Sequence, residues 1–148
     1  MKQYFKPHEI LTKKEPADLG MVYTSVQRVE VGAEPVALES GAEELCFICI
    51  GGRVDYQTEG QSGTAVQMDM LYLPIESGIT FTSSEGGVMM RYGAPCTRRT
   101  KFGHIRFADV EYTTTDEDGN TVTQVQENVK GVYVLYGGQL EFVQVFTD

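Results

Sequence analysis

Three side chains that could bind a metal ion or take part in catalysis lie in the segment G-A-E-E-L-C-F-I-C-I-G-G, residues 41–52. Cys46 and Cys49 have the C-x-x-C spacing of a metal site, and Glu44 could bind a divalent cation or transfer a proton. On an extended strand, side chains three positions apart point to opposite faces, so the two thiols cannot reach one metal ion. A zinc site would also need a second ligand pair, and only Cys96 remains. We therefore expect buried, inert cysteines.

A second group of candidate functional side chains is cationic. No Asp or Glu occurs between residues 86 and 108, a stretch that contains Arg91, Arg98, Arg99, Lys101, His104 and Arg106. In a chain of formal net charge −9, such a segment suits a carboxylate or phosphate, which arginine binds with a bidentate fork. The alternative is an exposed ribbon that pairs loosely with the acidic residues of 109–118 and contributes little.

Arg91 is the cation that the pattern singles out. It lies in the apolar run V-M-M-R-Y-G-A-P, where Val88, Met90 and Tyr92 alternate with the face that carries Arg91. If the first set packs outward, Arg91 faces the interior of a β-barrel and needs an anionic partner, either Glu44 or a ligand.

The remaining candidates are single side chains. Arg28 faces either the interior or the solvent, and Tyr72, like Tyr23 and Tyr56, could hydrogen-bond a sugar, although tyrosines of β-barrels more often lie in the core or at the rim. His104 could act as a general base, as could Glu44, although a lone histidine is more often structural. No Ser-His-Asp arrangement, phosphate-binding glycine loop or close carboxylate pair follows from the spacing.

The elements that must position these residues are predicted to be strands. After Gly20, runs rich in Val, Ile, Thr, Tyr and Phe alternate with turn pairs such as Gly51-Gly52, Asp118-Gly119 and Gly137-Gly138, at the spacing of about 8–12 residues typical of an antiparallel sandwich or barrel. Asp118-Gly119 and Gly137-Gly138 predict hairpins. The expected strands span 21–31, 44–50, 53–58, 64–67, 70–73, 79–83, 87–93, 102–112, 121–129, 131–136 and 139–146, with one short helix at 7–13.

Length and composition limit the class of protein. A chain of 148 residues suits one domain, and neither its N-terminus nor any later segment has the apolar run of a signal peptide or spanning helix. Three cysteines cannot all pair, which favours a reducing compartment, and we expect a cytoplasmic protein. The net charge of −9 argues against nucleic acid and anionic membranes as partners, and favours a small molecule or a protein.

Two motifs resemble those of the cupin superfamily. Glu44 and Gly51 match the E-x6-G half of the first cupin motif, but the two histidine positions of that motif hold Leu38 and Ser40. Asp69 matches part of the second motif.

In that second motif Pro74 is also present, whereas Met68 replaces a glycine and the expected histidine falls near Ile79 or Thr80. The resemblance implies an all-β cupin-type double-stranded β-helix, a jelly-roll barrel. Since three of the four family metal ligands are missing, we expect no metal ion and no other cofactor.

A closer resemblance is to the sugar-acid isomerases that include 5-keto-4-deoxyuronate isomerase and 5-deoxy-glucuronate isomerase. Over roughly residues 20–102 the chain is similar to their N-terminal half, most specifically in M-V-Y with R-x-x-V-G, in I-G-G and in Y-G-A-P. In that family the metal ligands belong to the C-terminal cupin. The resemblance implies one cupin domain over 1–148, with an N-terminal arm at 1–20, a core at 21–106 and extra C-terminal strands at 107–148, either as a lone metal-free cupin or as a fragment.

Two functions remain open, and the residues do not decide whether the chain is an enzyme. In the first, the protein binds a small anionic sugar acid in the barrel mouth, through Arg91, Glu44, Arg28 and Tyr72, and could isomerise it by proton transfer through Glu44 or His104. In the second, it is a non-catalytic cupin module for ligand binding or assembly. The apolar runs at 130–138 and 140–146 would leave strand edges that pair with another subunit, so we expect a homodimer or larger closed oligomer.

Overall fold

The computed structural model describes residues 4–109, 111–115, 117–119, 121–125, 131–136 and 139–144, with side chains for 4–109 and 117–119. The N-terminal arm contains a 3-10 helix, η1 (Pro7–Ile10), and a short helix, α1 (Pro16–Leu19), each with proline at its start. The helix expected at 7–13 is therefore shorter, and α1 was not expected. Beyond Leu11 the chain pairs instead with the first strand, through a bridge between Lys14 and Val26 that replaces helical hydrogen bonds.

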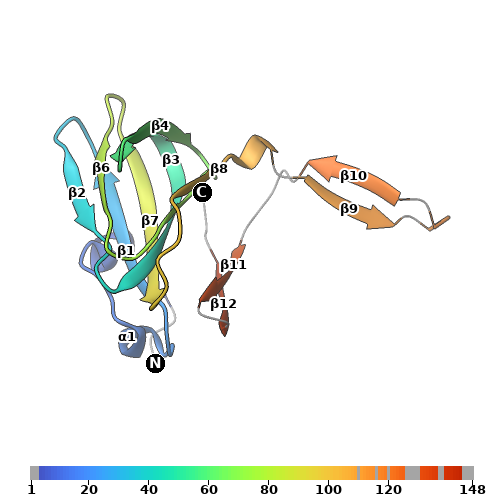
Figure 1. Cartoon of the computed structure of the whole chain (residues 1–148), viewed down its shortest axis with the longest axis horizontal. Helices are drawn as coiled ribbons and strands as arrows, with labels where there is room; N and C mark the ends of the chain where they lie inside the picture. Colours follow the sequence, from blue (N-terminus) through green and yellow to red (C-terminus); the bar gives the residue numbers. More distant parts are fainter. Residues whose placement is uncertain are drawn as a thin grey trace.

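Strands dominate the rest of the chain, as the sequence predicted (Figure 1). They are β1 (Ser25–Val31), β2 (Val36–Glu39), β3 (Glu43–Thr58), β4 (Gln61–Val66), β5 (Met70–Leu73), β6 (Gly78–Thr82), β7 (Gly87–Pro95), β8 (Gly103–Ile105), β9 (Glu111–Thr115), β10 (Thr121–Val125), β11 (Gly131–Tyr136) and β12 (Gln139–Gln144).

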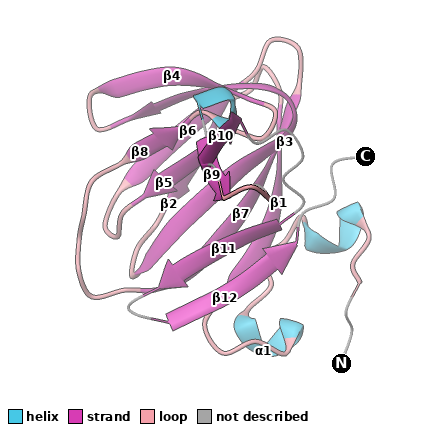
Figure 2. Cartoon of the chain, turned by 90° about the vertical axis from the view of Figure 1, so that its right-hand side faces the viewer, coloured by secondary structure: helices cyan, strands magenta, loops and turns pink. Residues whose placement is uncertain are grey.

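The long strand β3 belongs to two antiparallel sheets. Its first half pairs with β7 and β5, in the order β1-β7-β3-β5-β8, and its second half pairs with β4 and β6, in the order β2-β6-β3-β4 (Figure 2). The change of partners follows a register shift between Cys49 and Gly51. Gly52 has φ +69, and a Cβ there would lie 2.1 Å from the carbonyl oxygen of Gly86. The glycine pair therefore bends one strand, whereas the sequence predicted two strands separated by a turn.

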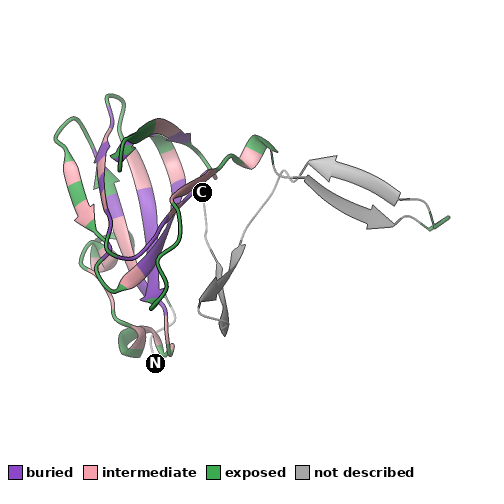
Figure 3. Ribbon diagram, in the orientation of Figure 1, coloured by how far each residue is buried: buried purple, intermediate pink, exposed green. Residues whose placement is uncertain are grey.

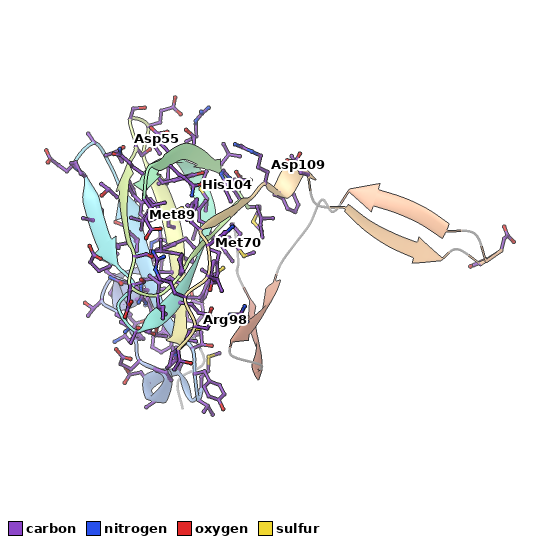
Figure 4. All side chains as sticks on the ribbon, in the orientation of Figure 1. Asp55, Met70, Met89, Arg98, His104 and Asp109 are labelled. Carbon is purple, nitrogen blue, oxygen red and sulfur yellow. The ribbon has the colours of Figure 1, made fainter. Side chains whose placement is uncertain are left out.

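The core lies between these two sheets. Leu45, Phe47, Leu71 and Met89 from the first sheet meet Phe81 from the second, and all five are fully buried. Figure 3 shows the buried positions along the paired strands, and Figure 4 places Met89 inside the barrel. Packing of this kind fills the centre of the barrel with apolar side chains, so polar groups are confined to its ends.

The opposite, outer face of the first sheet carries a second apolar cluster. Cys46, Ile48, Met90 and Tyr92 are buried there, and Ile10 of η1 packs against them. Cys46 thus lies outside while Cys49 lies in the core, which confirms that the two thiols point to opposite faces. Burial raises the pKa of Cys46 to about 12, so this thiol stays protonated and unreactive at neutral pH.

The C-terminal part differs in detail from the expected strands. The strand predicted at 102–112 is divided into β8, a 3-10 helix η2 (Phe107–Asp109) and β9, and β2 was not predicted. β9 and β10 form the expected hairpin, with Gly119 at φ +82. β11 pairs with β12 as expected, whereas Gly137-Gly138, 126–129 and 145–146 lie outside the described residues. Among the described helices, none has the length and apolar character needed to cross a membrane.

Candidate functional site

Arg91 lies on the inner face of β7. It pairs in register with Phe47 of β3, a fully buried core residue, while its neighbours Met90 and Tyr92 belong to the outer cluster. Arg91 is only 5% exposed. The inward orientation expected from the alternation of β7 agrees with the structure, so a guanidinium charge lies inside the barrel near one end.

The anionic partner of Arg91 is Glu43, whereas the sequence suggested either Glu44 or a ligand. Arg91 Nη2 lies 3.4 Å from Glu43 Oε1, and Arg91 Nη1 donates to Ser25 Oγ at 3.3 Å. Ser25 Oγ in turn donates to Glu43 Oε2 at 2.8 Å, and Lys13 Nζ binds Glu43 Oε1. We call Lys13, Ser25, Glu43 and Arg91 the Arg91–Glu43 cluster. It lies where β1 and β3 begin and β7 ends, since Glu43 pairs with Pro95 and Ser25 with Gly93.

The Arg91–Glu43 cluster keeps its carboxylate ionised. Burial by itself would raise the pKa of Glu43, but hydrogen bonds from Lys13 and Ser25 and the charges of Lys13 and Arg91 outweigh burial and lower the pKa. Two cations therefore face one carboxylate inside the cluster. Glu15 approaches Lys13 at 3.2 Å, but its side chain is 61% exposed, so water screens this contact.

Glu44 lies on the outer face, where it meets Tyr72. The Tyr72 hydroxyl donates to Glu44 Oε2 at 2.5 Å and accepts from Thr100 Oγ1 at 2.9 Å. Burial and the neighbouring Glu44 carboxylate raise the pKa of Tyr72 to about 12, so the phenol keeps its proton. The structure thus joins two of the predicted ligand-binding residues, Glu44 and Tyr72, but separates both from Arg91 by the thickness of a sheet.

His104 lies on β8 (Figure 4), and both of its ring nitrogens have hydrogen-bond partners. Its Nε2 lies 3.0 Å from Asp69 Oδ2, and its Nδ1 lies 2.9 Å from the Tyr56 hydroxyl. Asp69 also accepts the backbone N–H groups of Val66 and Phe107. Since an ionised carboxylate can only accept, Nε2 carries a proton, and in the neutral ring Nδ1 accepts from the Tyr56 hydroxyl. This arrangement favours the structural reading of His104 over the general base, because neither nitrogen is open to a ligand.

Two further candidate cations, Arg28 and Arg99, have their described partners outside the Arg91–Glu43 cluster. Arg28 pairs across the strands with Met90, on the outer face, and its Nε lies 3.2 Å from Glu30 Oε1. This position agrees with the solvent-facing alternative for Arg28. Arg99 binds Glu59 and donates to Ser77 Oγ, so its described acidic partner is not in the segment 109–118.

The positions that hold metal ligands in cupins have other roles here. Leu38 packs against the core and Ile79 belongs to it, at 2% exposure. Ser40 Oγ donates to the carbonyl oxygens of Pro74 and Ser77 and so holds a turn. Among the described residues, no group of three or more His, Cys, Asp or Glu side chains could hold a metal ion.

Sequence reasoning missed Glu43, Ser25 and Lys13. Glu43, Leu45 and Phe47 are two positions apart, so their side chains point to the same face of β3. Once Leu45 and Phe47 were known to form the core, this alternation would have placed Glu43 inward. Lys13 had no comparable signal, since its contact with Glu43 joins the N-terminal arm to a strand thirty residues later.

Comparisons with known proteins support the fold. The KduI/IolB family model matches residues 2–139, whereas no curated protein matches the chain. An IolB-like protein from Salmonella typhimurium LT2 is similar with a TM-score of 0.60 and 14% identity, over 71% of this chain and 44% of that one. Protein YlbA from E. coli has a TM-score of 0.55 and 16% identity, over 66% of this chain and 44% of that one. The chain thus spans less than half the length of these two proteins, and the all-β cupin-type barrel predicted from the sequence is confirmed.

Proposed function

Because this chain belongs to the KduI/IolB family, we propose that it binds a small anionic carbohydrate, of the uronate type, through the Arg91–Glu43 cluster and without a metal ion. The observation that carries the proposal is the position of Arg91. Arg91 is 5% exposed, yet its described contacts with Ser25 and Glu43, at 3.3 and 3.4 Å, are longer than the ~2.7–2.9 Å of a strong charge-assisted bond. A planar carboxylate could approach such a guanidinium more closely.

The electrostatics of the cluster favour an anion. Lys13 and Arg91 bring two positive charges against the single charge of Glu43, in a chain whose formal net charge is −9. Glu15 reaches Lys13 only from the exposed side, at 3.2 Å. A charge inside a protein interacts more strongly than one in water, so the buried guanidinium of Arg91 attracts a carboxylate at this end of the barrel. The surrounding negative charge also disfavours anions that lack a specific binding site.

A binding role is favoured over isomerisation. Isomerising a sugar acid requires an acid or base beside the bound molecule. Glu44 lies on the other face of the sheet, and both ring nitrogens of His104 are bonded. Glu43 is at the cluster, but its lowered pKa makes it a weak base at neutral pH. The second candidate function is a non-catalytic cupin module for ligand binding or oligomer assembly.

We also propose that the protein forms a homodimer or larger closed oligomer, which the apolar strands β11 and β12 support. We place it in the reducing cytoplasm, which the three free cysteines support. Light scattering of the purified chain at micromolar concentration tests the assembly, and a monomer mass would contradict it.

Calorimetric titration with D-glucuronate tests the binding role. We expect the wild type to bind and the variant Arg91→Met to lose about tenfold or more in affinity, because a charged hydrogen bond contributes about 1.5–3 kcal/mol. Arg28→Met is the matched control, since Arg28 faces outward beside Glu30, and its affinity should match the wild type. Methyl glucoside, which lacks the carboxylate, should not bind.

Two results would contradict the proposal. One is the absence of uronate binding by the folded wild type. The other is equal affinity in Arg91→Met, with circular dichroism showing that the variant is folded.

A further inference from the structure

Glu43 occupies the position that a ligand carboxylate would take. Both of its oxygens are bound: Oε1 by Lys13 Nζ and Arg91 Nη2, and Oε2 by Ser25 Oγ. These three donors come from the N-terminal arm, β7 and β1, so they converge on one carboxylate from separate segments. Convergence of this kind is how proteins recognise a carboxylate in a ligand.

The backbone also makes room for the carboxylate. At Gly93, an added Cβ would lie 2.9 Å from both Glu43 Oε2 and Ser25 Oγ, and 2.8 Å from a methyl carbon of Leu45. Any residue larger than glycine would therefore press on the carboxylate or on the hydroxyl that binds it. Glycine at this position leaves the carboxylate in contact with the backbone of β7.

Arg91 and Ser25 are held more firmly than the carboxylate, since Ser25 is fully buried. Arg91 lies within β7 and its side chain is 6% exposed, whereas Glu43 is the first residue of β3 and its side chain is 18% exposed. Glu43 follows a turn in which Gly41 has φ +60. Rotation of the Glu43 side chain toward solvent would leave Arg91 and Ser25 in place, because both lie in the paired strands β7 and β1. The Lys13 side chain is 32% exposed and also lies 3.2 Å from Glu15, so it can follow either carboxylate.

From these contacts we infer that Glu43 is an internal ligand, which a small carboxylate displaces from Lys13, Ser25 and Arg91. The inference rests on the proposed function for the identity of the natural ligand as a uronate-type acid. The Ser25 hydroxyl and the Gly93 carbonyl oxygen, 3.3 Å apart, could also meet a hydroxyl group next to the ligand carboxylate. The affinity for a ligand is then set by competition with Glu43, in the same molecule, and not by the donors alone.

Removal of the internal ligand gives a direct test. The variant Glu43→Ala should leave a vacancy that acetate or formate fills, so sodium acetate should raise its melting temperature in a saturable manner, at an ionic strength held constant with chloride. The wild type should respond much less. The double variant Glu43→Ala, Arg91→Met should not respond, and neither should Glu30→Ala, in which an outward-facing carboxylate paired with Arg28 is removed.

A second variant covers the case in which Glu43→Ala does not fold. Glu43→Gln keeps the size of the side chain but loses its charge, and it should bind acetate and D-glucuronate about fivefold or more tighter than the wild type. The inference is overturned if Glu43→Gln is folded and binds carboxylates no more tightly, or if acetate stabilises Glu30→Ala and the double variant as much as Glu43→Ala.

The two proposals fail in different ways. If acetate rescues Glu43→Ala but D-glucuronate binds neither the wild type nor Glu43→Gln, the internal ligand stands and the uronate function does not. If the wild type binds D-glucuronate through Arg91 but acetate and Glu43→Gln have no effect, the function stands and the internal ligand does not.

Discussion

Glu43 and Glu44 are neighbours in the chain, but their carboxylates lie on opposite faces of one sheet. Glu43 faces inward to two cations, whereas Glu44 faces outward to the phenol of Tyr72. The two acids therefore have different electrostatic surroundings although they share a peptide bond. Each gives a pH dependence that can be measured separately.

The ionised Glu43 carboxylate should stabilise the fold at neutral pH and lose this effect in acid. Because its pKa in the folded state is lowered from 4.5, its contribution is present above that value and is lost as the pH falls through the lowered pKa. We expect Glu43→Gln to cost about 2 kcal/mol at pH 7, as a buried charge pair loses one partner. The difference from the wild type should shrink in acid. Urea unfolding from neutral to acid pH measures it, and a difference that stays constant with pH would contradict the assignment.

The Tyr72 phenol should give the opposite dependence at alkaline pH. Its pKa is raised from 10.0 to about 12, so its contribution is present below pH 10 and is lost as the pH rises toward 12. We expect Tyr72→Phe to cost about 1–2 kcal/mol at pH 7, since Glu44 loses a donor, and the cost to fall at high pH. Tyr4→Phe, at a residue 69% exposed, is the control and should have no effect on urea unfolding. A cost for Tyr72→Phe that does not change up to pH 12 would argue against the raised pKa.

The bend in β3 should tolerate alanine at one glycine but not at the next. At Gly52, the positive φ and the close carbonyl oxygen of Gly86 should make Gly52→Ala destabilising by about 2 kcal/mol or more. Gly51 has an ordinary φ and no atom within 4 Å of an added Cβ, so Gly51→Ala should change the free energy of unfolding by about 0.5 kcal/mol or less. Urea midpoints compare the two variants, and equal midpoints would contradict the role of Gly52.

Asp69 should hold β8 and η2 against the barrel. It is 1% exposed and accepts from Val66, His104 and Phe107, so Asp69→Asn should cost about 3 kcal/mol. Hydrogen exchange should show the Phe107 amide losing protection first. Asp55→Asn is the control, because Asp55 is exposed and its described partner is the Thr64 hydroxyl. Unchanged protection of Phe107 in a folded Asp69→Asn variant would remove Asp69 from this role.

The inward position of Arg91 could be predicted because β7 alternates cleanly. Met89 and Arg91 share the inner face, while Met90 and Tyr92 share the outer one. The same rule placed Cys46 and Cys49 on opposite faces. The alternation of side chains along a strand predicted the face correctly wherever the face of one neighbouring residue could be inferred from the sequence.

The partner of Arg91 could not be predicted in this way. The first half of β3 is buried on both faces, so its apolar run shows no alternation and does not reveal which glutamate faces inward. Counting back from Gly51 selected Glu44, but the irregularity between Cys49 and Gly51 makes the spacing a poor guide to the face. Lys13 and Ser25 reach Glu43 only through tertiary contacts, which no local pattern encodes.

The sharing of β3 between two sheets has a consequence for the order of folding. Among the described strands that pair with β3, only β4 follows it through a tight turn, from Thr58 to Gln61, so this hairpin can form early. β5, β6 and β7 must each return to β3 from farther along the chain, and β1 can join only after β7 is in place. The chain therefore loses the entropy of closing these loops before most strand pairs form. We expect folding on the order of milliseconds to seconds, nucleated at the β3–β4 hairpin.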